Sequence, residues 1–538
     1  MKKTTTIIAL ILVLAMLLAA CGSKTETPAS TSSTPSSSTP STSTPAASTP
    51  AASTPSAPER KLKDTLTVGQ ANEPGMLNPQ GNNLVSMNQV DMTIYEGLII
   101  FDPITQEFKP SLAESWEQTD ELTYVFHLRK GVKFHNGSDF TAEDVHYTVG
   151  RLVNESATKS LYSALDDVNS KVIDDYTYEL HLKEPFSPFL RYIANARALI
   201  VCKDYLEEVG NEGNNRQPIG TGPFKFVEWV TGDHITVERN DEYWGEAPSL
   251  KTINFRFIVD NGIRAIELET GAVDLIYSVG AEDYDRLEAN PDLVTTMMPG
   301  WTHENMLWNM QSKVFQDVNL RAAMCLALDV PSIVETVWGK TASPSTGLYS
   351  MNLLGGDTDL WPRERNVELA KEYLAKAGYP NGGFKCEASF PNSTTTQQMF
   401  EAAQAQWAEV GIEVELVSYD QATIKERNAK GLTDFGRSNF TASTGDPDHA
   451  LSAWGIGYTG ILQPNNETIN DLKLKGRSTY DDAERAKIYY ELQKYVYDNY
   501  MAIPIMCSNM TYSYNKNIEN FTPTPDNLPI IAWIKLYE

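Results

Sequence analysis

The stretch QPIGTGPFKFVEWVTGDHITVERNDEYWGEAP, residues 217–248, contains two runs in which apolar and polar side chains alternate. Residues 224–230 and 235–238 each predict a strand, and the TGD sequence at 231–233 between them is typical of a turn. The stretch therefore predicts a β-hairpin. Just before it, Gly220 and Gly222 precede Pro223. We expect these glycines to let the backbone turn sharply before the proline fixes one dihedral angle.

The length and composition indicate a large folded protein. The chain has 538 residues, 41% of them hydrophobic, and ten tryptophans, which is enough for more than one core. Its net charge of −26 should repel nucleic acid and anionic lipid surfaces. No C-x-x-C spacing occurs, so a zinc knuckle or a thioredoxin-type site has no support. Four cysteines could pair after export, in a connectivity that the sequence leaves open: Cys202, Cys325, Cys386 and Cys507.

The first 60 residues predict a leader and a tether. Residues 1–20 read as a signal peptide, with Lys2 and Lys3 followed by an apolar run too short to span a membrane comfortably. The run ends in LAACG at 18–22, which resembles a bacterial lipobox and predicts that Cys21 is lipidated; the alternative is a secreted protein with an incidental cysteine. Residues 21–60 then form a Ser/Thr/Pro-rich tether that should stay extended and solvated.

Some sequence patterns are typical of catalytic or metal-binding sites, but the residues around them do not fit such sites. His127, His135 and His146 fall on a predicted strand, a turn and a helix without ligand spacing, so we expect structural roles rather than a metal site. A G-x-G-x-x-G match at residues 455–460 is followed by Pro464 where a dinucleotide-binding fold needs a helix. The sequence contains no G-x-S-x-G, H-E-x-x-H or G-x-x-x-x-G-K-[ST] pattern. We therefore expect no cofactor, no metal and no enzyme activity.

Ordered motifs along the chain resemble the extracytoplasmic solute-binding proteins of the peptide/nickel class of ABC importers. The resemblance covers the chain from about residue 62 to the C-terminus. It is carried by YEGLIIFD (95–102), LAESWE (112–117), TYVFHLRKGVKFHNG (123–137), TAEDV (141–145), PIGTGPF (218–224), RNDEYWG (239–245), GAVD (271–274) and WTHENMLWN (301–309).

This resemblance implies an α/β fold of the two-lobed periplasmic-binding-protein type II-like kind, with an extra inserted subdomain and two interlobe crossing strands. Lobe I would span residues 61–305, with the insert at about 96–214, lobe II would span 306–503, and residues 504–538 would return to complete the sheet of lobe I. Function would be capture of a solute between the lobes and delivery to a membrane permease with its ATPase. The protein would be a lipid-anchored monomer on the extracytoplasmic face of the cell membrane.

The ligand is less defined, because both charged anchors of the dipeptide-binding members are replaced. Those members use an aspartate four residues before the proline of a D-x-x-D-P pattern, where this chain has Ser443, and an arginine before a proline, where it has Phe390. A buried charge needs a partner, so the two ends of a dipeptide lack obvious anchors. We expect an oligopeptide, or alternatively an uncharged solute such as an oligosaccharide. A surface receptor or peptide chaperone without import is a further alternative.

The candidate ligand contacts come from several parts of the chain. Met76 and Asn78 lie in the loop at 71–80, which faces the cleft in the resembled family but could equally be an ordinary loop. Trp301, Trp454 and Tyr458 could stack on a solute or pack in the core. Arg437, Asn439 and Asp446 are candidate polar contacts, although Asp446 with Pro447 could form only a turn. His303 could ligate a metal chelate.

Overall fold

The computed structural model describes residues 60–81, 84–154, 159–310, 312–454 and 466–538. The chain divides into residues 1–59 and a unit of residues 60–538, and all that follows concerns the second unit. The predictions for the signal peptide, Cys21, the tether, Tyr458 and the glycines of 455–460 lie outside the described residues.

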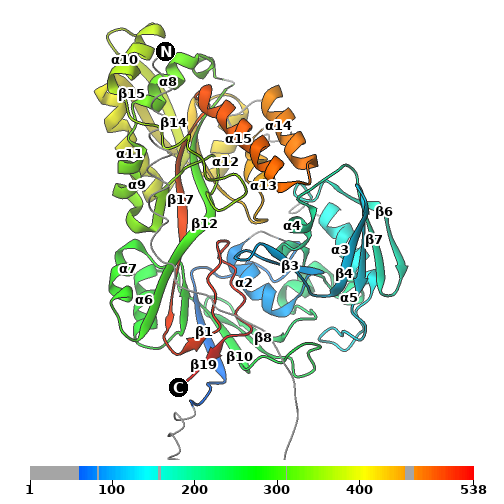
Figure 1. Ribbon diagram of the computed structural model, residues 1–538. Helices are drawn as coiled ribbons and strands as arrows, with labels where there is room; N and C mark the ends of the chain where they lie inside the picture. The colour runs from blue at the N-terminus through cyan, green and yellow to red at the C-terminus, as the bar shows by residue number, and fades with distance from the viewer. Residues whose placement is uncertain (1–59, 82–83, 155–158, 311, 455–465) are drawn as a thin grey trace, which may run out of the picture. The chain divides into compact units, whose positions relative to one another are not determined.

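A mixed sheet of eleven strands forms the framework of this unit (Figure 1). β1 pairs parallel with β10 and β11, and β14 pairs parallel with β15 and β16, whereas the other pairs are antiparallel. In sheet order the strands are β15 (Ile412–Tyr419), β14 (Phe384–Pro391), β16 (Phe435–Thr441), β12 (Leu293–Trp308), β17 (Ala502–Asn515), β11 (Leu275–Tyr277), β1 (Thr65–Gln70), β10 (Thr252–Phe257), β9 (His234–Arg239) and β8 (Phe224–Val230), with β13 (Ala342–Pro344) paired to β17.

Two long antiparallel strands, β12 and β17, belong to both halves of this sheet. At one end β17 pairs with β11, and at the other β12 pairs with β16. Their own ladder is interrupted twice, between Pro299 and His303 and between Glu304 and Asn305. We call the half with β1 and β8–β11 lobe I and the half with β14–β16 lobe II. The two-lobed fold with two crossing strands is thus confirmed (Figure 1).

Lobe II is an α/β layer with its own apolar core, centred on Trp308, Phe400, Trp407 and Phe435. Several of its helices begin at a side-chain cap: Asp317 accepts from Asn319 N, and Asp481 accepts from Glu484 N. The helix Thr394–Glu409 begins in the same way after Ser393, whose side chain accepts from Thr396 N. The helices are α8 (Val318–Leu326), α9 (Val330–Trp338), α10 (Val367–Lys376), α11 (Thr394–Glu409), α12 (Gln421–Ala429), α13 (Pro447–Ala450), α14 (Glu467–Ser478) and α15 (Asp482–Asp498).

A second, antiparallel sheet with its own core is inserted into lobe I (Figure 1). Tyr124, Phe126 and Leu128 alternate inward on its strand β5. Asp144 accepts from Thr141 N at the start of α3 and caps this helix. The sheet order is β4 (Ala113–Asp120), β5 (Thr123–Leu128), β7 (Thr177–Leu182), β6 (Leu165–Asp174), with α3 (Ala142–Asn154), α4 (Phe189–Ile193), α5 (Lys203–Arg216) and the hairpin β2 (Ile99–Asp102)–β3 (Glu107–Pro110). Lobe I also contains α2 (Val85–Ile94), α6 (Asn261–Glu269) and α7 (Ala281–Glu288).

The hairpin of residues 217–248 forms as predicted, but its preceding glycines serve another purpose. β8 and β9 pair antiparallel, and Gly232 in the turn has φ +77°. Gly220 and Gly222 do not adopt positive φ. A Cβ at Gly220 would lie 2.1 Å from the carbonyl oxygen of Ile94, and one at Gly222 would lie 2.6 Å from it. The glycines are therefore required because the end of α2 presses against this backbone.

The C-terminal tail joins the sheet of lobe I through residues 512–514 of β17, which pair with β11. Beyond β17, β18 (Ile518–Glu519) and β19 (Lys535–Leu536) form a separate two-stranded sheet, and the residues between them are a loop. Pro523, Pro525 and Pro529 in this loop cannot donate backbone hydrogen bonds to a ladder. The GAVD motif at 271–274 forms a turn, and β11 begins directly after it at Leu275.

The four described cysteines are all buried and unpaired. Burial raises the pKa of each thiol, to about 12 for Cys325. The thiolate is the reactive form of cysteine, so these protonated thiols react slowly at neutral pH.

The carboxylate of Glu96 joins three of the sequence motifs. Its oxygens accept hydrogen bonds from the hydroxyl of Thr221 (2.9 Å), the hydroxyl of Tyr243 (2.7 Å) and Nε1 of Trp244 (2.8 Å). Burial raises the pKa of Glu96, and the three donors act against that rise. One buried charge thus ties the end of α2 to the segments before and after the hairpin.

We expect Glu96→Gln to lower the free energy of unfolding by about 2 kcal/mol, because an amide removes the charge and turns one acceptor into a donor. Glu246→Gln, an exposed change in the same region, should leave it unchanged. Urea denaturation of both variants measures this. Equal midpoints would show that the three bonds to Glu96 contribute little.

Candidate functional site

A cavity of about 430 Å³ lies where the β2–β3 hairpin, the end of α4, the C-terminal loop and lobe II meet. This volume falls in the range of sites that enclose whole small molecules. Lobe II contributes Ser443 and Thr444, and the crossing strand β12 contributes Trp301; the other walls come from lobe I and its insert. Its aromatic lining consists of Tyr95, Phe101, Tyr243, Trp301 and Trp533.

Trp301 lies in the first break of the β12–β17 ladder, and this break frees its backbone for other partners. Its N–H donates to the carbonyl of Pro525 (2.9 Å), and its carbonyl accepts from the N–H of Ala442 (3.2 Å). Gly445 has φ +68°, and a Cβ there would lie 2.6 Å from the indole. Trp301 is therefore fixed between the C-terminal loop and lobe II, with 2% of its surface exposed.

Two hydroxyl groups beside Trp301 are left without protein partners. The side-chain oxygens of Ser443 and Thr444 are buried and make no hydrogen bond among the described residues. Both residues line the cavity, and Thr444 is only 2% exposed. Because an unsatisfied buried hydroxyl is costly, these groups are suited to meet polar atoms of a ligand.

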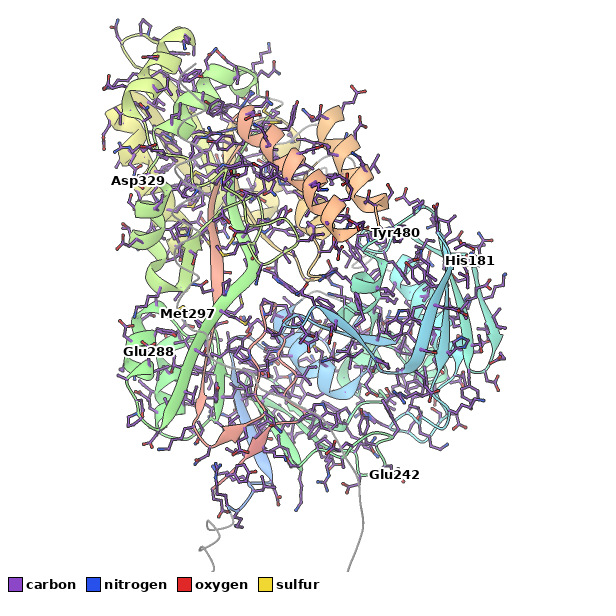
Figure 2. The ribbon with its side chains drawn as sticks, in the orientation of Figure 1. His181, Glu242, Glu288, Met297, Asp329 and Tyr480 are labelled. Atoms are coloured by element: carbon purple, nitrogen blue, oxygen red, sulfur yellow. The ribbon has the colours of Figure 1, made fainter. Side chains whose placement is uncertain are left out.

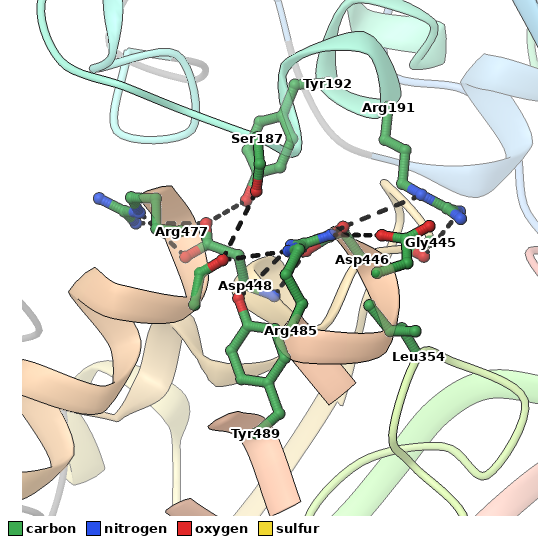
Figure 3. A network of polar contacts seen from close by, with 12 residues as sticks. Ser187, Arg191, Tyr192, Leu354, Gly445, Asp446, Asp448, Arg477, Arg485 and Tyr489 are labelled. Carbon is green, nitrogen blue, oxygen red and sulfur yellow. Dashed lines mark hydrogen bonds and ion pairs between the residues drawn. The ribbon is translucent and has the colours of Figure 1, made fainter. Parts of the chain in front are cut away.

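The insert and lobe II contact each other directly beside the cavity (Figure 3). The hydroxyl of Tyr192 donates to Oδ2 of Asp448 (2.8 Å). Nη1 of Arg191 donates to the carbonyl of Gly445 (3.0 Å), and Nδ2 of Asn195 donates to the carbonyl of Ser443 (2.7 Å). At the outer margin, near Tyr480 in Figure 2, the hydroxyl of this tyrosine donates to the carbonyl of Glu121 (3.0 Å).

Asp446, predicted as a ligand contact, is instead the centre of a buried ion-pair cluster (Figure 3). It caps α13 by accepting from Asp448 N (2.9 Å), and Nη2 of Arg485 reaches its two oxygens at 2.9 and 3.2 Å. Nε of Arg191 lies 3.8 Å from its Oδ2, and this guanidinium stacks 4.2 Å from the ring centre of Phe101. Asp446 is thus neutralised within the protein and does not line the cavity.

The other predicted contacts divide between the cavity and the rest of the fold. Trp301 and Ser443 line the cavity. Phe390 is buried in the core of lobe II, stacked 4.7 Å from Phe400, and Trp454 is buried in the core that includes Leu451. Five more described residues are also absent from the lining: Met76, Asn78, His303, Arg437 and Asn439.

Polar partners explain where several of these side chains are held. Asn78 accepts from Nη2 of Arg151 (3.3 Å). Nε of Arg437 lies 3.4 Å from Oε1 of Glu304, and Nδ2 of Asn439 donates to its Oε2 (3.1 Å). None of the residues in these contacts lines the cavity.

His303 is buried, and burial lowers its pKa to about 4, so it is neutral at pH 7. The described residues contain no group of three or more His, Cys, Asp or Glu side chains placed to hold a metal ion. In the same part of the chain, no helix has both the length and the hydropathy to cross a membrane.

Sequence reasoning missed most of the cavity lining. Tyr95 and Phe101 belong to the motif YEGLIIFD (95–102). Nothing in that motif distinguishes residues that line the cavity from residues of the core. Asp526 and Trp533 come from the C-terminal loop, where the prolines indicate only irregular backbone. Thr444 directly follows Ser443, a predicted ligand contact, and this position beside Ser443 is the sequence signal that could have identified Thr444.

The contact between Tyr192 and Asp448 should favour the arrangement in which the insert touches lobe II. We expect Tyr192→Phe to lower stability by about 1–3 kcal/mol and to increase the radius of gyration, because a hydrogen bond to a charged group between the two parts is lost. Small-angle X-ray scattering and urea denaturation measure these effects.

Tyr162→Phe is the matched control. The Tyr162 hydroxyl donates to the carbonyl of Tyr192 (3.1 Å), entirely within the insert. This variant should lose comparable stability without a change in scattering. If both variants scatter like the parent protein, the Tyr192–Asp448 contact does not govern lobe separation.

The chain is similar to known proteins in both sequence and structure. Residues 107–460 match the family model described as "Bacterial extracellular solute-binding proteins, family 5 Middle". The glutathione-binding protein GsiB of Escherichia coli O6:K15:H31 (strain 536 / UPEC) is 29% identical over 465 residues, covering 84% of this chain and 90% of GsiB. The structure of HbpA2 from Haemophilus parasuis aligns with a TM-score of 0.78 at 26% identity, over 88% of this chain and all of HbpA2. AgaA of A. tumefaciens R10, in complex with agropinic acid, aligns with a TM-score of 0.74 at 28% identity, over 88% and 99% of the two chains.

Proposed function

Because this chain belongs to the bacterial extracellular solute-binding proteins of family 5, we propose that it captures a short peptide or a peptide-sized organic solute and delivers it to the permease and ATPase of an ABC importer. The observation that carries this proposal is the cavity of about 430 Å³ with walls from both lobes. A solute held there would touch Ser443 and Thr444 on one side and lobe I on the other.

The proposed mechanism is closure of the lobes on the solute. A ligand that contacts both lobes stabilises the arrangement in which they meet, because its contacts with one lobe are lost when they separate. The bonds from Arg191, Tyr192 and Asn195 to lobe II would form in the same movement. Binding and closure are then one equilibrium, and the permease would recognise the closed surface.

The proposed hinge is the β12–β17 pair, at the breaks near Trp301. The lobe boundaries expected from the sequence, at 305/306 and 503/504, would then lie in these two strands. The expected segments are lobe I at 61–305, its insert at 96–214, lobe II at 306–503 and a return at 504–538. We retain these boundaries as part of the proposal.

Relatives and cavity size both support a compact ligand. GsiB is named for glutathione binding, and AgaA was solved with agropinic acid, so similar chains take small organic solutes. The cavity volume favours a short oligopeptide over a long one. An oligosaccharide is the second candidate, because five aromatic rings line the cavity and sugars stack on such faces.

We also propose that Cys21 carries the lipid that anchors the protein to the extracytoplasmic face of the membrane, with residues 22–60 as a flexible tether. The protein would act as a monomer. A surface receptor on the same fold remains the alternative. Deletion of the neighbouring permease gene should abolish solute uptake for an importer and leave signalling intact for a receptor.

A thermal-shift panel of di- to pentapeptides and oligosaccharides tests solute capture. A ligand at 100 times its dissociation constant adds about 2.7 kcal/mol to stability, which gives a clear rise in melting temperature. Scattering of the same samples should show a smaller radius of gyration with the ligand. A protein that responds to no solute, and releases none on denaturation, would contradict the proposal.

A further inference from the structure

Two of the charged side chains that line the cavity form no ion pair among the described residues. The lining residues of the Asp, Glu, Lys and Arg types are Glu96, Asp102, Lys109, Arg191 and Asp526. Lys109 lies 2.6 Å from Asp102, and Arg191 bonds Gly445 and Gln106 and neighbours Asp446. Glu96 and Asp526 are the two without an ion pair. Glu96 accepts three hydrogen bonds from neutral donors, and Asp526 has fewer hydrogen-bond partners.

The carboxylate of Asp526 has only neutral partners among the described residues. Its Oδ1 accepts from the N–H of Leu528 (3.0 Å), and the side chain of Thr524 also bonds to it. Burial raises the pKa of this carboxyl, and the two hydrogen bonds oppose the rise. A buried carboxylate without a cation is costly, and a ligand cation would remove that cost.

The position of Asp526 relative to Trp301 is defined by backbone contacts. Pro525, its neighbour, accepts from the N–H of Trp301, and on the other flank the Trp301 carbonyl accepts from Ala442, next to Ser443. The loop is held in place because Gln89 donates to the carbonyl of Asn527 (2.9 Å). The segments that contain Asp526 and Ser443–Thr444 are therefore each joined to Trp301, and all of these residues line the same cavity.

The lining has three acidic and two basic residues, which leaves it one negative charge in excess. Lys109 and Arg191 are already engaged, so the cavity has no free cation for a ligand carboxylate. We propose that Asp526 binds a positively charged amino group of the solute, and that the cavity takes amine-bearing solutes of net charge +1 in preference to zwitterions, neutral molecules and anions. This inference rests on the proposed solute-binding function.

Four forms of one dipeptide test the charge preference by isothermal titration calorimetry. The probes are alanyl-phenylalanine amide (cation), alanyl-phenylalanine (zwitterion), N-acetyl-alanyl-phenylalanine amide (neutral) and N-acetyl-alanyl-phenylalanine (anion). We expect the cation to bind most tightly and the anion most weakly. Asp526→Asn should weaken cation binding at least about tenfold, because a charge-assisted bond becomes a neutral one, and should leave the neutral probe unchanged.

Two further variants make the result specific. Asp526→Glu keeps the charge and should retain the preference for the cation. Asp175→Asn, an exposed change on the turn between β6 and β7, should leave all four affinities unchanged. Cation binding to Asp526→Asn at parental affinity, or tightest binding of the anion to the parent protein, would overturn the inference. Melting temperatures of the variants verify that each one is folded.

The solute released by denaturing the purified protein provides an independent readout. A released molecule with an amino group and no carboxylate supports the inference, whichever probes bind. A released zwitterion, anion or neutral solute overturns it while leaving solute capture intact. If no probe binds and no solute is released, the proposed function itself fails.

Discussion

The architecture depends on two strands that are shared between its halves. β12 and β17 pair with each other and also with strands of opposite lobes, so neither lobe can complete its sheet without them. The ladder breaks near Trp301, and there the backbone turns from strand pairing to the C-terminal loop and to Ala442. The same break that weakens the connection between the lobes therefore places an aromatic ring in the cavity. A hinge and a binding surface made from one segment would couple movement to occupancy.

Charge is distributed differently on the two sides of the cavity. In lobe II, Asp446 and Asp448 are matched by Arg485 and Arg477, so the segment that meets the insert is electrostatically complete before any ligand arrives. In the C-terminal loop, Asp526 has no such match among the described residues. The contacts between the lobes can therefore form with any bound solute, whereas we propose that Asp526 in the C-terminal loop selects which solute binds.

Much of the fold could be predicted from the sequence, because local signals carried it. Alternation predicted β8 and β9, and the TGD sequence predicted the turn between them. The cavity was harder, because its walls come from segments hundreds of residues apart. Trp301 and Ser443 were found through motif positions. Asp446 carries the same chemistry as a ligand contact, but only the fold brings Arg485 to it. Asp526 lies in a loop without periodicity, and no local pattern distinguishes it from a solvated aspartate.

The buried, unpaired sulfurs of Cys202, Cys325, Cys386 and Cys507 bear on how the molecule matures. None of the four forms a cross-link, so the described fold can be reached without an oxidising enzyme or a disulfide isomerase. Protons held tightly on these sulfurs also slow their attack by peroxide or by other thiols. The protein should therefore bind its solute equally well with and without oxygen. A reducing agent should not change its melting temperature.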